Sequence, residues 1–158
     1  MISWLRGLLG ATPSLSEARR ADAAAMAVLH AASFHRGWSD GEFERFMTDR
    51  DVIAHRAVIH GKLVGFILSR MAAEEAEILS VAVASRERGR GIARDLLLMH
   101  MRRLAGAGCR TIFLEVDETN QPARRLYKSA GFREVGRRES YYRQGTQTTA
   151  ALVLRRDI

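Results

Sequence analysis

The segment from Val81 to Ala93 (VAVASRERGRGIA) combines residue types that bind phosphate. An apolar run typical of a strand leads into an arginine-rich turn, and two glycines, Gly89 and Gly91, precede a helical pattern. The first N–H groups of a helix have no partner within the helix, and the helix dipole adds about half a positive charge at that end. Glycines let a phosphate approach these amides closely, and arginines neutralise its charge. The spacing therefore predicts a pyrophosphate-binding turn.

Two common phosphate-binding motifs do not fit this turn. A P-loop needs the sequence G-K-[ST] after its first glycine, and none follows Gly91. A dinucleotide-binding G-x-G-x-x-G needs a third glycine at the position of Arg94. The glycine pair alone is a weak signal of a phosphate site, so the prediction depends on the strand before it and the helix after it. The arginines available to a phosphate here are Arg86, Arg88, Arg90 and Arg94.

The surrounding elements alternate between helical and strand periodicity. Helical patterns occupy residues 20–34, a segment after the S-x-x-E capping box that begins at Ser39, residues 89–105, and a segment between Asn120 and Gly131. Strand patterns occupy residues 52–59, 63–71, 77–83, 111–116, 132–142 and 148–154. The order predicts an α/β fold, with a mixed, mostly antiparallel sheet of six to seven strands flanked by about four helices on both faces.

Composition restricts the class of protein. The chain has 158 residues, 47% hydrophobic and 27% charged, which argues against disorder. A single cysteine, Cys109, cannot form an internal disulfide, and we expect it to be buried and inert. Residues 14–158 are predicted to form one domain, preceded by a leader of residues 1–13 that is helical or frayed. The apolar stretch of the leader is too short for a secretory signal, and no apolar run in the sequence is long enough for a membrane span. We therefore expect a cytoplasmic protein without membrane contact.

The net charge of +7 comes from arginine rather than lysine. Only Lys62 and Lys128 are lysines among the 25 basic residues. Two explanations fit this excess of arginine over lysine. Arginine binds oxyanions through its planar, two-pronged guanidinium, which would suit nucleic acid, a phosphorylated cofactor or an acidic surface. Alternatively, a coding bias places arginine instead of lysine on a solvated surface.

The motifs together resemble the GCN5-related N-acetyltransferase (GNAT) superfamily. The run R-G-R-G-I-A from Arg88 to Ala93 matches its R/Q-x-x-G-x-G/A signature, and TIFLEVDETN and ARRLYKSAGF are similar to its later motifs in order and spacing. The combination L-E-V, N-x-P-A and L-Y-x-S-x-G-F, followed by a tyrosine pair, resembles the bacterial ribosomal-protein alanine N-acetyltransferases, the RimI type. The similarity spans about residues 16–154 and implies the GNAT fold.

The resemblance implies a site for acetyl-CoA as cosubstrate. Its pyrophosphate would lie against the backbone amides of Arg88, Gly89, Arg90, Gly91, Ile92 and Ala93. The main chain of Val81 and Val83 would pair with the pantetheine arm, and Asn120 would contact the cofactor near its thioester.

The resemblance also implies catalytic roles for two residues. Glu115 would be the general base, acting directly or through water, and Tyr127 the general acid that protonates the departing thiolate. An α-amino group has a pKa of about 7.7 to 8.0, so much of it must lose a proton before it attacks a thioester near neutral pH. An acceptor site is implied at Trp38, Tyr141 and Tyr142.

Each of these residues also has a purely structural interpretation. Tyr127 lies on the inward stripe of its helix, Glu115 is at a strand end, Asn120 suits a helix N-cap, and Trp38 suits helix packing. The five histidines include no i,i+4 pair, so we expect no metal site.

The implied acceptor is a protein N-terminus, specifically the N-terminal alanine of ribosomal protein S18. Carboxylates at Glu74, Glu75, Glu77, Asp117 and Glu118 are candidates to attract a cationic N-terminus. A small-molecule amine or a lysine side chain is the alternative acceptor, because a fold does not determine its substrate. From another class, the chain could be a non-catalytic acyl-CoA sensor or an RNA-associated module. It lacks RNA-reading motifs, so we expect no direct nucleic-acid partner, and we expect a monomer or weak dimer.

Overall fold

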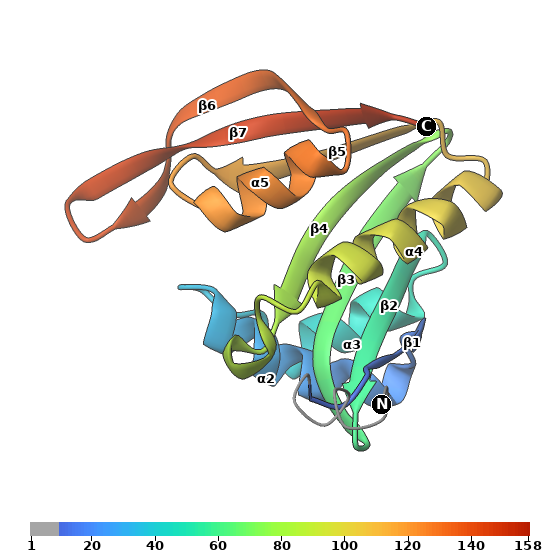
Figure 1. Cartoon of the computed structure of the whole chain (residues 1–158). Helices are drawn as coiled ribbons and strands as arrows, with labels where there is room; N and C mark the ends of the chain where they lie inside the picture. The colour runs from blue at the N-terminus through green and yellow to red at the C-terminus, as the bar shows by residue number, and fades with distance from the viewer. Residues whose placement is uncertain (1–9) are drawn as a thin grey trace, which may run out of the picture.

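A mixed sheet of seven strands forms the centre of the molecule, with helices on both faces (Figure 1). The structure, a computed structural model, describes residues 10–158, so most of the predicted leader lies outside the described residues. The strands are β1 (Ser14–Glu17), β2 (Val52–Ile59), β3 (Lys62–Ala72), β4 (Glu75–Val83), β5 (Thr111–Asp117), β6 (Arg133–Gln144) and β7 (Gln147–Asp157). Their order is β1-β2-β3-β4-β5-β7-β6, and only β4 and β5 run parallel. The predicted α/β architecture is confirmed.

The helices divide the core into two layers. They are α2 (Ala23–Ser33), α3 (Asp40–Thr48), α4 (Ile92–Gly106) and α5 (Gln121–Ser129), with short 3-10 turns η1 (Arg20–Asp22) and η2 (Ser85–Glu87). On one face, α4 and α5 contribute to a buried cluster with β4 and β5, which includes Leu96, Leu97 and Leu114. On the other face, α2 and α3 pack against Phe66 and Ala82. Figure 1 shows α4 crossing in front of the strands, with α2 and α3 behind them.

Local sequence signals set several of the helix boundaries. Ser39 accepts a hydrogen bond from the Glu42 backbone N–H, and the Glu42 carboxylate accepts one from Ser39, as the predicted capping box requires. Asn120 caps α5 through the Ala123 N–H, and Pro122 occupies the first turn, where its missing N–H costs nothing. Strand β1 was not predicted, because four residues at a sheet edge carry too little periodicity.

The parallel pair β4–β5 opens into a V. Their pairing covers only Glu75–Ile78 of β4 and Thr111–Leu114 of β5. An extra residue in β4, Leu79, forms a β-bulge against β3, and bulges bend and twist the strand that carries them. Beyond this point the two strands diverge, as Figure 1 shows. The cleft described below lies at this divergence.

Two buried histidines, His55 and His100, pair between β2 and α4. Nδ1 of His55 on β2 is 2.7 Å from Nδ1 of His100 on α4, and Nε2 of His100 is 2.6 Å from Oγ of Ser69. One Nδ1 must donate and the other accept, so the accepting ring is uncharged. Burial, and secondarily the nearby His55, lowers the pKa of His100 from 6.5 to about 3.

We therefore expect the fold to lose stability in mild acid. The folded pKa of His100 is below its unfolded value, so its contribution is fully present above about pH 6.5 and is lost as the pH falls toward 3. Between pH 6.5 and 4.5 this single group should lower the free energy of unfolding by ~2 kcal/mol. Urea unfolding across this range measures it, with His100→Gln as the comparison. Equal pH slopes for the two proteins would contradict the assignment.

Candidate active site

The V between β4 and β5 holds a continuous cleft. One part, the α4 half, has a volume of about 470 Å³ and is lined by the turn before α4 and by the start of α4. The other part, the β5 half, has a volume of about 480 Å³ and is lined by Leu114–Asp117 and by the end of α2. Six residues line both halves: Ser33, Phe34, Val81, Asn120, Ala123 and Tyr127. Residues from distant parts of the chain therefore meet in one groove.

The α4 half has the features expected of a pyrophosphate site. Gly91, with φ +80°, is the residue before α4 and lines the cleft, as do Gly89 and Arg94. A Cβ atom built on either glycine would meet no protein atom within 4 Å, so space in front of the helix N-terminus is open. Among the described residues, no strand pairs with the main chain of β4 beyond Ile78 on this side. An extended anionic ligand therefore fits both the amides and the open strand edge.

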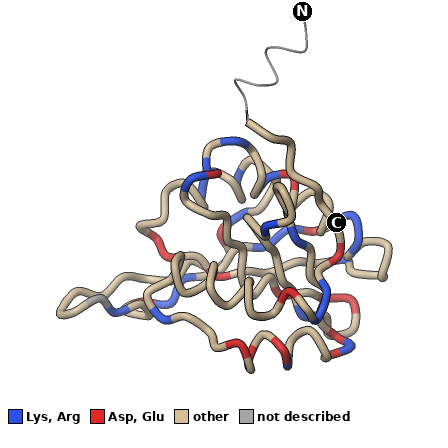
Figure 2. Tube along the Cα trace, turned by 90° about the horizontal axis from the view of Figure 1, so that it is seen from below, with Lys and Arg blue, Asp and Glu red and all other residues tan. Residues whose placement is uncertain are grey.

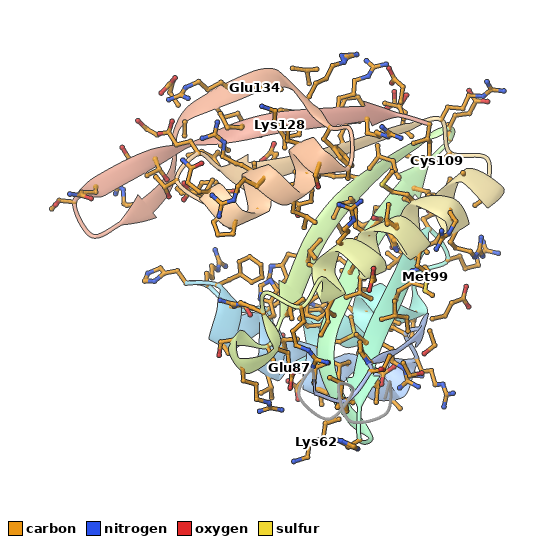
Figure 3. The ribbon with its side chains drawn as sticks, in the orientation of Figure 1. Lys62, Glu87, Met99, Cys109, Lys128 and Glu134 are labelled. Atoms are coloured by element: carbon orange, nitrogen blue, oxygen red, sulfur yellow. The ribbon has the colours of Figure 1, made fainter. Side chains whose placement is uncertain are left out.

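Two of the predicted arginines have other contacts. Nε of Arg88 donates to the Val83 carbonyl oxygen at 3.0 Å, which ties the turn to the end of β4. The Arg90 guanidinium pairs with the Glu87 carboxylate at 2.5 Å and donates to the Ala11 carbonyl at 2.6 Å. Figure 3 shows Glu87 on the turn before α4. Arg90 does not line the cleft, so its side chain stabilises the turn instead of facing a ligand there.

Glu115 faces the β5 half from the end of β5. Its side chain is 20% exposed, and Oε1 lies 3.1 Å from Nε of Arg138 on β6. Leu114 and Val116 on either side point into the core shared with α4, so strand alternation turns Glu115 to the opposite face. The ion pair with Arg138 orients the carboxylate at the edge of the cleft.

Tyr127 lies at the junction of the two halves. Its ring is buried, 7% exposed, and packs edge-on against Phe132 with centroids 5.7 Å apart. Burial, and secondarily Tyr142, raises the pKa of the phenol above its ordinary value, so the hydroxyl stays protonated at neutral pH. Tyr127 is therefore a core residue whose phenol stays protonated beside the cleft.

Two other predicted residues, Asn120 and Trp38, make structural contacts and also line the cleft. The Asn120 Oδ1 atom caps α5, and the residue lines both halves of the cleft. Trp38 stacks on His30 with ring centroids 4.4 Å apart, and its backbone N–H donates to Nδ1 of His30. Both aromatic rings line the β5 half. Burial lowers the pKa of His30, which keeps this ring neutral as an acceptor.

The tyrosine pair divides between the cleft and the surface. Tyr142 lines the β5 half and is partly buried. Tyr141 is 52% exposed and does not line the cleft, although the centroid of its ring is 5.2 Å from that of the Tyr142 ring. The guanidinium of Arg138 lies 5.6 Å from the Tyr141 ring centroid. The structure therefore brings Tyr142, and not Tyr141, to the cleft.

Several lining residues were missed by sequence reasoning: His30, His35, Arg36, Ser80 and Thr119. His30, His35 and Arg36 flank the predicted Trp38, so proximity along the chain was the available signal. Ser80 reaches the cleft through the β4 bulge, which no periodicity indicated.

The predicted acidic cluster does not act as one group. Burial raises the pKa of the Asp117 carboxyl, but the hydrogen bonds that Thr119 and Thr149 donate to it lower the pKa. The net pKa of Asp117 is below its ordinary value. Glu74 pairs with Arg110 away from the cleft. Of the five candidates, only Asp117 lines the β5 half, where it remains ionised beside Glu115.

The arginine surplus does not form one basic surface. Figure 2 shows Lys and Arg positions scattered along the trace and interleaved with acidic residues. Many arginines are in ion pairs, for example Arg56 with Asp22 at 2.7 Å and Arg137 with Glu118 at 2.7 Å. Most of the arginines are therefore spread over the surface and do not form a single site for an anionic partner.

Other features lie away from the cleft. Figure 3 shows Cys109 just past the end of α4, where it is buried and burial raises the pKa of its thiol. A separate cavity of about 500 Å³ beside β2 contains none of the predicted site residues. Within residues 10–158, no cluster of three or more His, Cys, Asp or Glu side chains is arranged to hold a metal, and no helix is long and apolar enough to cross a membrane.

Comparisons with known proteins agree with this architecture. Residues 23–132 match the Acetyltransferase (GNAT) family. The chain is 35% identical over 144 residues to the N-alpha-acetyltransferase RimI of Mycobacterium tuberculosis, covering 87% of this chain and 88% of that protein. It is 30% identical over 105 residues to the ribosomal protein bS18-alanine N-acetyltransferase of Escherichia coli strain K12, covering 66% of this chain and 70% of that protein.

A solved structure shows the same fold. The crystal structure of the ribosomal-protein-S18-alanine N-acetyltransferase from Escherichia coli superimposes with a TM-score of 0.87 at 24% identity, covering 93% of this chain and 94% of that one. The family match includes every cleft-lining residue except Tyr142, from α2 through the turn before α4 to the end of α5. The chain therefore belongs to the GNAT acetyltransferase family and is an acetyl-CoA-dependent N-acetyltransferase.

Proposed function

We propose that this enzyme acetylates the N-terminal α-amino group of a protein, and that the N-terminal alanine of ribosomal protein S18 is its substrate. The observation that supports this most is the continuous cleft, in which Tyr127 and Asn120 line both halves. A cosubstrate in the α4 half and an amine in the β5 half would meet beside the Tyr127 hydroxyl.

The α4 half is assigned to acetyl-CoA. Backbone amides from Arg88 to Ala93 would bind the pyrophosphate, since the helix N-terminus is open and its glycines leave room. The unpaired edge of β4 at Val81 and Val83 would bind the pantetheine amides as a neighbouring strand would. The thioester then lies near Asn120 and Tyr127.

The chemistry is a direct transfer between the two substrates. Glu115 accepts a proton from the α-ammonium, directly or through one water, and frees the nitrogen lone pair. The amine attacks the thioester carbon, a backbone N–H near Val83 stabilises the oxyanion, and the C–S bond breaks. Tyr127, which its raised pKa keeps protonated, donates its proton to the departing thiolate. The nitrogen loses its second proton as the amide forms, and this proton restores the Tyr127 hydroxyl through water, while Glu115 releases its own proton to solvent.

The β5 half suits a cationic amine on a peptide. The carboxylates of Glu115 and Asp117 face it, and aromatic rings of Trp38 and Tyr142 form other parts of its wall. The similarity to proteins named as N-terminal alanine acetyltransferases supports the same acceptor class.

A panel of acceptors tests the proposal. Purified enzyme with acetyl-CoA receives a basic peptide that begins with alanine, the same peptide with a blocked N-terminus and a free internal lysine, and a polyamine. Released thiol is measured for each. We expect transfer to the free N-terminus alone; transfer only to the lysine or the polyamine would favour the alternative acceptors.

Substitution of Gly91 tests the pyrophosphate site. Valine strains a backbone at φ +80° by about 1 to 2 kcal/mol and places a branched side chain before the amides, so we expect Gly91→Val to weaken acetyl-CoA binding by about tenfold or more. Gly61→Val is the matched control, because Gly61 has φ +75° and open space but lies in the β2–β3 turn outside the cleft. Calorimetry measures both dissociation constants, and an unchanged value for Gly91→Val would argue against this site.

A further inference from the structure

Within residues 10–158, the hydroxyl of Ser80 on β4 has no hydrogen-bond partner. Ser80 is 7% exposed, and its Oγ atom is buried without a partner in the part of the chain that the structure describes. Leaving a buried hydroxyl unpaired destabilises the fold. Ser69, on the adjacent strand β3, is fully buried too, but its Oγ is paired with His100 at 2.6 Å. An unpaired group beside a substrate cleft calls for a functional explanation.

The β-bulge at Leu79 sets the direction of Ser80. Before the bulge, Ile78 points into the core shared with α4. After it, Ala82 points into the core beneath α2 and α3, and strand alternation gives Ser80 the same direction as Ala82. Without the extra residue, Ser80 would face α4 with Ile78.

This direction brings Ser80 and Glu115 to the same cavity. Glu115 faces away from the α4 core, because its neighbours Leu114 and Val116 occupy that core. Both Ser80 and Glu115 line the β5 half, from opposite sides of the V. The bulge therefore opens the cleft and also supplies it with a hydroxyl.

We infer that Ser80 is an acceptor-binding residue whose hydroxyl oxygen accepts a hydrogen bond from the attacking amine. This rests on the proposed function. A neutral primary amine carries two N–H groups and one lone pair. With one N–H on Ser80 and the other directed to Glu115, the lone pair is left to point at the thioester carbon. Rotation about the Cα–Cβ bond of Ser80 turns the hydroxyl toward the amine, and no covalent bond to Ser80 forms.

Ser80→Ala tests this role. With acetyl-CoA saturating, we expect kcat/KM for the alanine-led peptide to fall about tenfold, while the dissociation constant of acetyl-CoA stays unchanged. The melting temperature should stay the same or rise, because the substitution removes an unpaired buried group. Ser80→Thr retains the hydroxyl and should recover kcat/KM to within about threefold of the unmodified enzyme.

Ser69→Ala is the matched control. It removes a buried hydroxyl one strand away that already has a partner, so it should lower the melting temperature and leave kcat/KM unchanged. The opposite patterns of the two alanine variants separate substrate binding from a structural role, such as a bond to a buried water.

The outcomes are distinguishable. A Ser80→Ala enzyme whose kcat/KM stays within twofold of the unmodified enzyme, or whose loss is matched by weaker acetyl-CoA binding and a lower melting temperature, overturns the inference alone. Failure of the unmodified enzyme to acetylate any peptide N-terminus overturns the proposed function, and this inference with it.

Discussion

Replacing Tyr127 with Phe should lower kcat by about 10²- to 10⁴-fold, the usual contribution of a general acid, and leave acetyl-CoA binding nearly unchanged. The substitution removes only the hydroxyl, and the ring can keep its packing against Phe132. Because burial raises the pKa of Tyr127 above 10.0, the unmodified enzyme should show no loss of turnover from its ionisation below about pH 10. Steady-state kinetics together with acetyl-CoA calorimetry measure both quantities.

Tyr141→Phe controls for loss of a phenol in the same protein. Tyr141 is exposed and outside the cleft, so its variant should have normal turnover. If Tyr127→Phe turns over within threefold of the unmodified enzyme, the proton reaches the thiolate from another source and the assignment of Tyr127 is wrong.

Replacing Glu115 with Gln should lower kcat/KM for the peptide by about 10²-fold at pH 7, since an amide cannot accept the proton of the α-ammonium. The defect should shrink as the pH rises from 7 to 9, because an amine with a pKa of about 7.7 to 8.0 then loses its proton to solvent before it binds. Rates of peptide acetylation across this pH range give the profile.

Glu118→Gln is the matched control for this substitution. Glu118 follows β5 closely in the chain and pairs with Arg137, but it does not line the cleft, so its variant should keep the pH profile of the unmodified enzyme. A Glu115→Gln enzyme with an unaltered rate at pH 7 would remove Glu115 from the mechanism.

Local signals predicted much of the fold. The capping box at Ser39, the Asn120 cap and the glycine-rich turn before α4 each depend on residues within one or two helical turns, so their sequence sufficed. Strand β2 was predicted with its observed limits, Val52–Ile59, because its apolar β-rich run ends at a hairpin turn.

Features that depend on tertiary packing were not predictable. The bulge at Leu79 adds one residue to a strand, and that shift reverses the faces of all residues after it, including Ser80. The contact from Arg90 to Ala11 joins positions 79 residues apart, so an arginine expected to neutralise phosphate is bound elsewhere. The resemblance implied both Tyr141 and Tyr142 as acceptor-site residues, and only the path of β6 shows that Tyr142 lines the cleft and Tyr141 does not.

The N-terminal peptide of ribosomal protein S18 tests the central claim most directly. Mass spectrometry would compare this peptide from parent cells, from cells lacking the gene for this chain, and from deleted cells that carry either the unmodified gene or a Glu115→Gln, Tyr127→Phe double variant. We predict an acetylated α-amino group in the parent, its loss on deletion, and restoration by the unmodified gene only. Acetylation that persists after deletion, or that is absent from the parent, would contradict the account.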